Sequence, residues 1–188
     1  MTTFEEQKKK SAKPLLWISM ISMAMIFAGL TSALVVRKAE GNWLAYDFPI
    51  WFYISTALII LSSFTMNWAK KSVKKDDLET AQKGLNWTII LGLGFALSQY
   101  LTWGALYDEG VYFTGPGSNA SGSFLYVLTL LHLLHLAGGI IALLITAFKA
   151  KRGLYSSQNS IGIELCAIFW HFLDFLWLYL FLFLLYNH

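Results

Sequence analysis

The stretch IGIELCAIFWHFLDFLWLYLFLFLLY, residues 161–186, decides the fold, because it is long and apolar enough to cross a lipid bilayer as one helix. A spanning helix needs roughly 20 predominantly apolar residues. Four more stretches meet that criterion, and none alternates with the period of two that a membrane β-strand shows. The sequence therefore predicts an all-α polytopic membrane protein, residues 1–188 forming a single membrane domain, with five transmembrane helices over about residues 15–36, 49–69, 85–107, 122–148 and 161–186.

The composition points the same way. The 188 residues are 56% hydrophobic and only 13% charged, whereas a soluble domain carries about a quarter charged residues. A soluble chain of this length could not bury so much apolar surface in its own core. Cys166 is the single cysteine, so the chain forms no internal disulfide framework. The basic residues lie in loops and form no patch for nucleic acid.

The basic residues also indicate an orientation. Twelve of the fourteen lie in the N-terminal tail (residues 1–14) and in two alternate segments, residues 70–83 and 149–152. The other side of the membrane has only Arg37 and Lys38. Because short cytoplasmic loops are enriched in Lys and Arg, we expect the basic N-terminal tail and the two segments to be cytoplasmic.

Asp174 is the most informative polar residue at membrane depth. At about 1.5 Å per residue it lies roughly 18 Å from Gly162, near the bilayer centre. A charge there is unfavourable, so such a residue faces other protein and is a candidate functional site. On the preceding predicted helix, His135 lies at a similar depth. We expect Asp174 and His135 to hydrogen-bond, directly or through water.

The alternative for these polar residues is a metal site formed by His132, His135, His171 and Asp174. His132 and His135 are three positions apart on one helix face, and imidazole binds Zn, Cu and Fe. However, the sequence has no His-Glu-x-x-His or Cys-x-x-Cys pattern. A buried polar network that fixes helix packing is therefore favoured. We expect no metal, no other cofactor and no catalytic residue in this chain.

Four further features carry structural expectations. Glu164 lies in the first turn of the last span, where the helix dipole favours a carboxylate, and an ordinary role there is as plausible as a specific contact. The apolar stripe from Phe169 to Phe183 is expected to face lipid or a partner. Lysines beside the second span are expected to contact anionic headgroups. Small residues should allow close helix contacts; they are Gly92, Gly94, Gly138 and Gly139.

Recognisable motifs lie in four of the five spans. Residues 170–178 read WHFLDFLWL, similar to the pattern W-H-F-x-D-x-x-W-L; its positions are held by Trp170, His171, Asp174 and Trp177, and Glu164 lies shortly before.

The other motifs are shorter. Residues 131–136, LHLLHL, are similar to L-H-G-L-H-V and place His132 and His135. Residues 61–65, LSSFT, match S-S-x-T, and Gln99 matches a frequent glutamine of the third span. Together these motifs resemble subunit III of the haem–copper oxidases, cytochrome c oxidase in particular, in its short five-helix bacterial form. The resemblance covers nearly the whole chain from about Leu15.

This resemblance implies a non-catalytic subunit of a respiratory terminal oxidase in the bacterial inner (cytoplasmic) membrane. Such an oxidase reduces oxygen in aerobic electron transport and translocates protons. Subunits I and II hold the haem and copper, whereas subunit III stabilises the catalytic subunit and binds phospholipid. The expected partners are therefore subunits I and II, phospholipids and a larger respiratory supercomplex. The chain would have no catalytic site of its own while belonging to an oxidoreductase.

The sequence departs from the family pattern at three positions. Met23 and Thr102 stand where many members carry membrane-buried glutamates, which leaves Asp174 as the only deep acid. Leu133 replaces the glycine of the L-H-G-L-H motif. These replacements put a proton-linked role of the missing carboxylates in doubt.

Two other functions remain open at this point. One is the related accessory protein of nitric oxide reductase. The other is a small transporter for protons or cations that uses Asp174. No span is broken by a central proline and no repeated halves are evident, whereas transporters often have both.

Overall fold

The computed structural model describes the backbone of residues 4–187 and the side chains of residues 11–187, so the side chains of Lys8, Lys9 and Lys10 lie outside the described part. The fold is all-α with five long helices, as predicted. Each contains a stretch long and apolar enough to span a membrane. The helices are α1 (Phe4–Ala39), α2 (Ile50–Lys74), α3 (Leu78–Asp108), α4 (Ala120–Lys151) and α5 (Ile161–Asn187).

The helices extend beyond the apolar spans because polar residues add further turns outside them. The largest difference is in α1, which includes residues 4–14 of the predicted basic tail. Side-chain caps set two helix starts. At the start of α3, the Asp77 carboxylate accepts the backbone N–H of Thr80 at 3.0 Å, and at the start of α4, the Asn119 side chain accepts the backbone N–H of Ser121 at 3.0 Å. Pro49 caps α2, where its missing N–H leaves no helical bond unmade.

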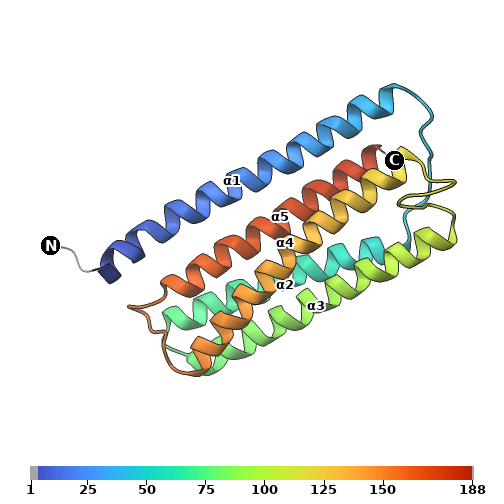
Figure 1. Ribbon diagram of the computed structural model, residues 1–188. Helices are drawn as coiled ribbons and strands as arrows, with labels where there is room; N and C mark the ends of the chain where they lie inside the picture. Colours follow the sequence, from blue (N-terminus) through green and yellow to red (C-terminus); the bar gives the residue numbers. More distant parts are fainter. Residues whose placement is uncertain (1–3, 188) are drawn as a thin grey trace.

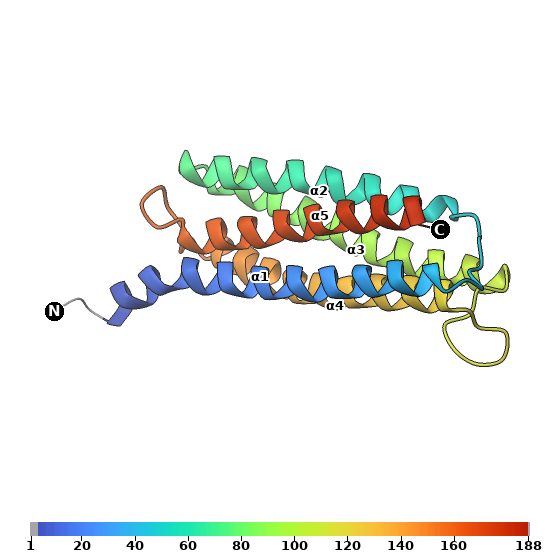
Figure 2. The same ribbon diagram turned by 90° about the horizontal axis from the view of Figure 1, so that it is seen from above.

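The five helices run alternately up and down along a common direction (Figure 1). Helix α2 packs most extensively on α3, and α3 packs on α4. Helix α1 lies at the edge of the bundle and contacts only α4 and α5 among the described helices. Seen from above, α5 lies between α1 and α2 (Figure 2). The last helix is therefore the one that joins α1 and α2.

The two ends of the bundle differ in charge. The start of α1 and the connections after α2 and α4 lie at one end (Figure 2), which we call the lysine-rich end. The connections 40–49 and 109–119 lie at the opposite end. Loop charge and topology thus agree, because every second connection is basic.

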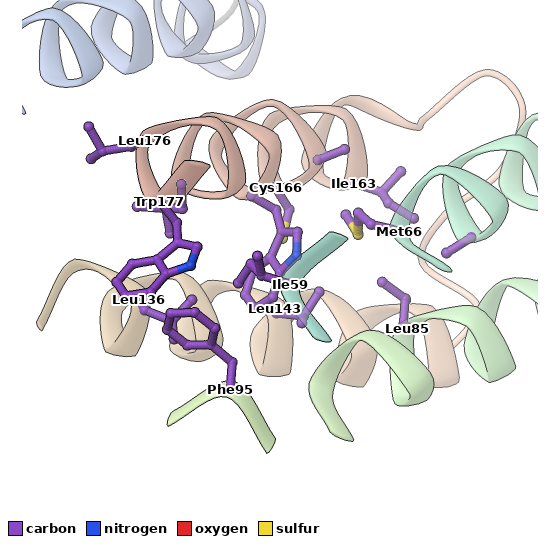
Figure 3. Close-up of a cluster of buried hydrophobic side chains, with 14 of the residues drawn as sticks. Ile59, Met66, Leu85, Phe95, Leu136, Leu143, Ile163, Cys166, Leu176 and Trp177 are labelled. Carbon is purple, nitrogen blue, oxygen red and sulfur yellow. The ribbon is translucent and has the colours of Figure 1, made fainter. Parts of the chain in front are cut away.

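The hydrophobic core is built around α5. Trp170, Leu173 and Trp177 are fully buried, and Trp177 packs near Leu136 and Phe95 (Figure 3). The expectation that the whole stripe from Phe169 to Phe183 faces lipid or a partner is therefore wrong. Lipid and protein core are both apolar, so hydrophobicity alone does not tell which face is buried.

Small residues create the space for these indoles. A Cβ added to Gly92 would lie 2.8 Å from the Trp170 ring, and one added to Gly139 would lie 2.8 Å from Leu173. The expected close helix contacts are thus present at Gly92 and Gly139. Gly138 faces open space, and a Cβ at Gly94 would meet Leu58 at an ordinary 3.6 Å.

A carboxylate joins two connections at the lysine-rich end. Asp76 adopts a left-handed backbone with φ of 58°, and its Oδ1 accepts the backbone N–H of Ser157 at 2.6 Å. Hydrogen bonding from Ser157 holds the pKa of the Asp76 carboxyl below its usual range. The α2–α3 connection is thereby held against the α4–α5 connection.

We predict that Gly92→Ala destabilises the bundle by about 1–3 kcal/mol, because the rigid Trp170 indole must move away from the new methyl group. Circular dichroism of thermal unfolding in detergent micelles measures this change. Gly138→Ala is the matched control, since its methyl group enters open space. Equal unfolding temperatures for the two variants would contradict the close contact.

A second prediction concerns pH. Because the Asp76 pKa is lowered by folding, the stabilisation is present above the unfolded pKa of about 4 and is lost as pH falls through the folded pKa. Asp76→Asn retains a left-handed-tolerant residue but replaces the carboxylate with a weaker acceptor. We expect faster hydrogen exchange at the Ser157 amide near neutral pH, and a difference from wild type that disappears in acid.

Exchange mass spectrometry of the segment containing Ser157, in wild type and variant at each pH, makes this comparison. Glu109→Gln is the control, because it removes an exposed acid at the other end of the bundle. A difference that persisted unchanged into acid would refute the carboxylate's role.

Candidate functional site

Two tryptophans hydrogen-bond α5 to α2 in the interior. The indole N–H of Trp170 donates to Ser62 Oγ at 3.0 Å, and that of Trp177 donates to Thr56 Oγ1 at 3.0 Å. Both indoles are fully buried. Because Tyr and Trp polar groups need a partner when buried, these two bonds fix how α5 sits on α2.

The two hydroxyl acceptors are themselves held in place. Ser62 donates to the carbonyl of Ile59 at 2.7 Å, and Thr56 donates to that of Phe52 at 3.1 Å. Each hydroxyl therefore donates a hydrogen bond within its own helix and accepts the indole N–H with a lone pair. This explains why short hydroxyl side chains, rather than larger polar ones, lie at these positions on α2.

His171 lies in the groove between α5 and α2. Its Nδ1 is 2.8 Å from Ser63 Oγ, and its Nε2 is 3.2 Å from Asn67 Oδ1. The side chain is partly exposed, at 30%. Both ring nitrogens therefore have a hydrogen-bond partner on α2, which orients the imidazole across the groove.

Asp174 lies one turn further along α5 and is buried, at 5% exposure. Its Oδ2 is 3.6 Å from His171 Nδ1, close enough for an ion pair when the histidine is protonated. Neither carboxylate oxygen has a hydrogen-bond partner among the described residues. Asp174 and His171 together form the acid–imidazole pair of this chain.

The predicted direct bond between Asp174 and His135 is not formed. His135 Nδ1 lies 2.8 Å from the carbonyl oxygen of Leu131, and its ring packs against Phe27 of α1 at 5.7 Å between centroids. His135 thus points toward α1, whereas Asp174 pairs with His171 on the side of α2. Similar depth in the membrane did not determine which way each side chain points around its helix.

Gln99 on α3 and His132 on α4 are two further buried polar residues. Trp103 donates to Thr129 at 3.0 Å, and the Phe95 ring lies 5.8 Å from the His132 ring. Gln99 lies one turn from each of those α3 residues. Both side chains are fully buried, and none of their polar atoms has a described hydrogen-bond partner.

Glu164 makes the specific contact that was one of its two expected roles. Its Oε2 lies 3.3 Å from Lys13 Nζ, and its Oε1 lies 3.8 Å from Lys74 Nζ. Ser160 Oγ also donates to Oε1 at 3.1 Å. One carboxylate therefore joins α1, α2 and α5 at the lysine-rich end.

The three histidines that the structure describes do not converge on a common point. His171 faces Ser63 and Asn67, His135 faces the Leu131 carbonyl, and His132 lies among aromatic rings. Among the side chains of residues 11–187, no group of three His, Cys, Asp or Glu is arranged to hold a metal ion.

Thr102 and Met23, where the motif resemblance leads us to expect glutamates in many family members, differ in their surroundings. Thr102 is fully buried, and its hydroxyl donates to the carbonyl of Ser98 at 2.9 Å. Met23 is half-buried on α1. At position 102 a neutral hydroxyl thus bonds within its own helix, whereas an acid there would need a partner.

Sequence reasoning missed the α2 partners of the site. Ser63 and Asn67 hold His171, and Thr56 holds Trp177. The signal that could have found them is the run of small polar residues in the second span, since hydroxyl and amide side chains there need partners from another helix. Lys74, expected at headgroups, also pairs with Glu164.

Comparison with known proteins gives a consistent result. The family described as "Cytochrome c oxidase subunit III" matches residues 46–188. The chain is 30% identical over 174 residues to cytochrome c oxidase subunit 3 of Thermostichus vulcanus, covering 88% of this chain and 82% of that protein.

Two further relatives bear similar names. A probable cytochrome c oxidase subunit 3 of Nocardia farcinica is 29% identical, covering 91% of this chain and 84% of the relative. One of Rickettsia bellii is 32% identical, covering 73% of this chain but only 47% of that longer protein. The match thus extends to relatives of different length.

We predict that Trp177→Phe destabilises the bundle by about 1–3 kcal/mol, because it removes the bond to Thr56 and leaves space in the core. Thermal unfolding followed by circular dichroism in detergent gives the difference. Trp68→Phe, at an indole that is 45% exposed, is the control and should have little effect. The bond would be unimportant if both variants unfolded like wild type.

Proposed function

The chain belongs to the family of cytochrome c oxidase subunit III, and from this premise we propose that it is a non-catalytic subunit that stabilises the catalytic subunit of its oxidase. As a subunit III of a haem–copper terminal oxidase, it is a multi-pass membrane protein that works with other oxidase subunits. The family match over most of the chain is the observation that carries the proposal.

The interior of the bundle supports a structural role. Its centre is filled with large side chains, including Phe95, Trp170 and Trp177, rather than left open along the bundle axis. The buried hydroxyls mainly bond to carbonyls of their own helices. Such an interior suits a rigid packing element better than a conduit. The family match likewise favours an oxidase subunit over a nitric oxide reductase accessory protein or an Asp174-dependent transporter.

The proposed partners follow from this role. Subunits I and II would hold the haem and copper and would cover part of the outer surface of this chain. Large apolar side chains are exposed on all five helices, so phospholipid would cover the remainder. The same proposal includes assembly of the oxidase into a larger respiratory supercomplex.

We further propose a location in the bacterial inner membrane, with the lysine-rich end in the cytoplasm. The basic residues of the connections at that end support this orientation. Lysines there, including Lys70 and Lys71, would also contact anionic headgroups.

The test is purification of the tagged chain from its native membrane in mild detergent. We expect haem to co-purify, visible in a reduced-minus-oxidised spectrum, together with oxygen consumption. The haem type and the electron donor would then identify the oxidase, and further co-purifying haem proteins would reveal a supercomplex.

The matched comparison is the same oxidase isolated without this chain. A non-catalytic subunit predicts an unchanged haem spectrum but a lower unfolding temperature and faster loss of activity during turnover. A colourless, monodisperse chain that purifies alone would contradict the proposal. If removal of the chain abolished the haem signal instead of lowering stability, its non-catalytic role would be contradicted.

A further inference from the structure

A cavity of about 690 Å³ lies at the end of the bundle opposite the lysines. It is formed by the last turns of α3, the start of α2, the connection 109–119 and the first part of α4. Aromatic rings make up most of its wall: Trp51, Tyr100, Trp103, Tyr107, Tyr112, Phe113 and Tyr126.

The charge at this cavity is negative. Asp108 is its only charged lining residue. Glu109 follows directly in the chain, and residues 108–121 contain no Lys or Arg. The cavity therefore combines several ring faces, each electron-rich, with one carboxylate and no basic side chain. That combination favours a cation over an anion.

Much of the cavity wall is held in position. The Trp103 indole donates to Thr129 at 3.0 Å, and the Tyr126 hydroxyl donates to the carbonyls of Trp103 at 3.2 Å and Val111 at 3.0 Å. The rings of Tyr107 and Tyr112 meet edge to face at 5.1 Å. The connection 109–119 is thus fastened to α3 and α4 rather than free to fill the cavity.

The cavity spans the depth of a phospholipid headgroup and its upper chains. Tyr100 and Asp108 are eight residues apart on α3, roughly 12 Å along the helix. Tyr100 and Tyr107 are exposed, at 69% and 62%, and α3 is covered only by α2 and α4 among the described helices. The cavity therefore borders the surrounding lipid, with its acidic part toward the end of the helix.

We propose that this cavity binds the ammonium headgroup of a zwitterionic phospholipid. The ammonium group would lie against the rings beside Asp108, with the glycerol and upper chains along Tyr100 and Leu101. An ordinary belt of interfacial Trp and Tyr anchors a helix without preference for headgroup charge, whereas an aromatic wall with a carboxylate prefers a cation. The inference rests on the proposed function only in placing the chain in a membrane.

The test is native mass spectrometry of the full-length chain released from detergent micelles, titrated with phosphatidylcholine or with phosphatidylglycerol of identical acyl chains. We expect tighter binding of phosphatidylcholine. Tyr107→Leu and Asp108→Asn should each weaken that binding about threefold to fivefold, and neither should weaken the binding of phosphatidylglycerol.

Two variants control for general effects. Glu109→Gln removes the adjacent acid, which does not line the cavity, and Tyr186→Leu removes an exposed aromatic on α5. Both should bind like wild type. Equal loss of the two lipids in Asp108→Asn, or no headgroup preference in wild type, would overturn the proposal.

A second measurement separates lipid from a protein occupant. A photoreactive amino acid in place of Tyr112, in the intact oxidase in its membrane, should cross-link to phospholipid. A cross-link to another polypeptide would overturn the lipid assignment in favour of a basic segment of that partner. Co-purification with haem is unaffected by either result, so failure of this inference is distinguishable from failure of the proposed function.

Discussion

Hydrocarbon offers no hydrogen-bond partner, so a polar group carried into the membrane is costly unless the protein supplies one. In this bundle the buried hydroxyls meet that requirement mainly by donating to a carbonyl one turn back, as Thr88 does to Gly84 and Thr129 does to Leu125. Each such hydroxyl still has a free lone pair, and three of them accept an indole N–H from a neighbouring helix. The interhelical bonds therefore depend on local bonds made first within each helix.

The sequence predicted the number of helices and the ends at which the basic connections lie, because both depend on position along the chain alone. A span is recognised by comparing its length with the bilayer thickness. Which face of a span is buried was not predictable in the same way, since lipid and core are equally apolar. Helix α5 shows this: it is among the most hydrophobic spans, yet the most buried, and its exposed positions include Phe175 at 73%.

The polar site was predicted only in part, and the reason is related. The depth of Asp174 follows from counting residues, but its partner depends on how each helix is rotated about its axis. That rotation selected His171, three residues away on the same helix, over His135 on α4. The Lys13–Glu164 pair joins residues 151 apart, and no local pattern indicates it. Motif resemblance located Trp170 and Trp177 without showing that their partners are hydroxyls of α2.

Helix α1 shows how these interactions combine at the edge of the bundle. It packs on α4 and α5 alone among the described helices, and it has the least buried of the five spans. Three polar contacts along its length nevertheless join it to α5: Lys13 to Glu164 at 3.3 Å, Thr31 to the Tyr179 hydroxyl at 2.9 Å, and Lys38 to the Asn187 carbonyl at 3.1 Å.

The contacts at the two ends involve partly exposed lysines, and exposed ion pairs contribute only about 0–1 kcal/mol. The Thr31–Tyr179 bond lies between them, in the apolar part of the span, where water does not compete for it. Packing of Phe27 against His132 and His135 adds apolar contact at nearly the same level. The Thr31–Tyr179 bond and these ring contacts therefore anchor α1 near the middle of its span.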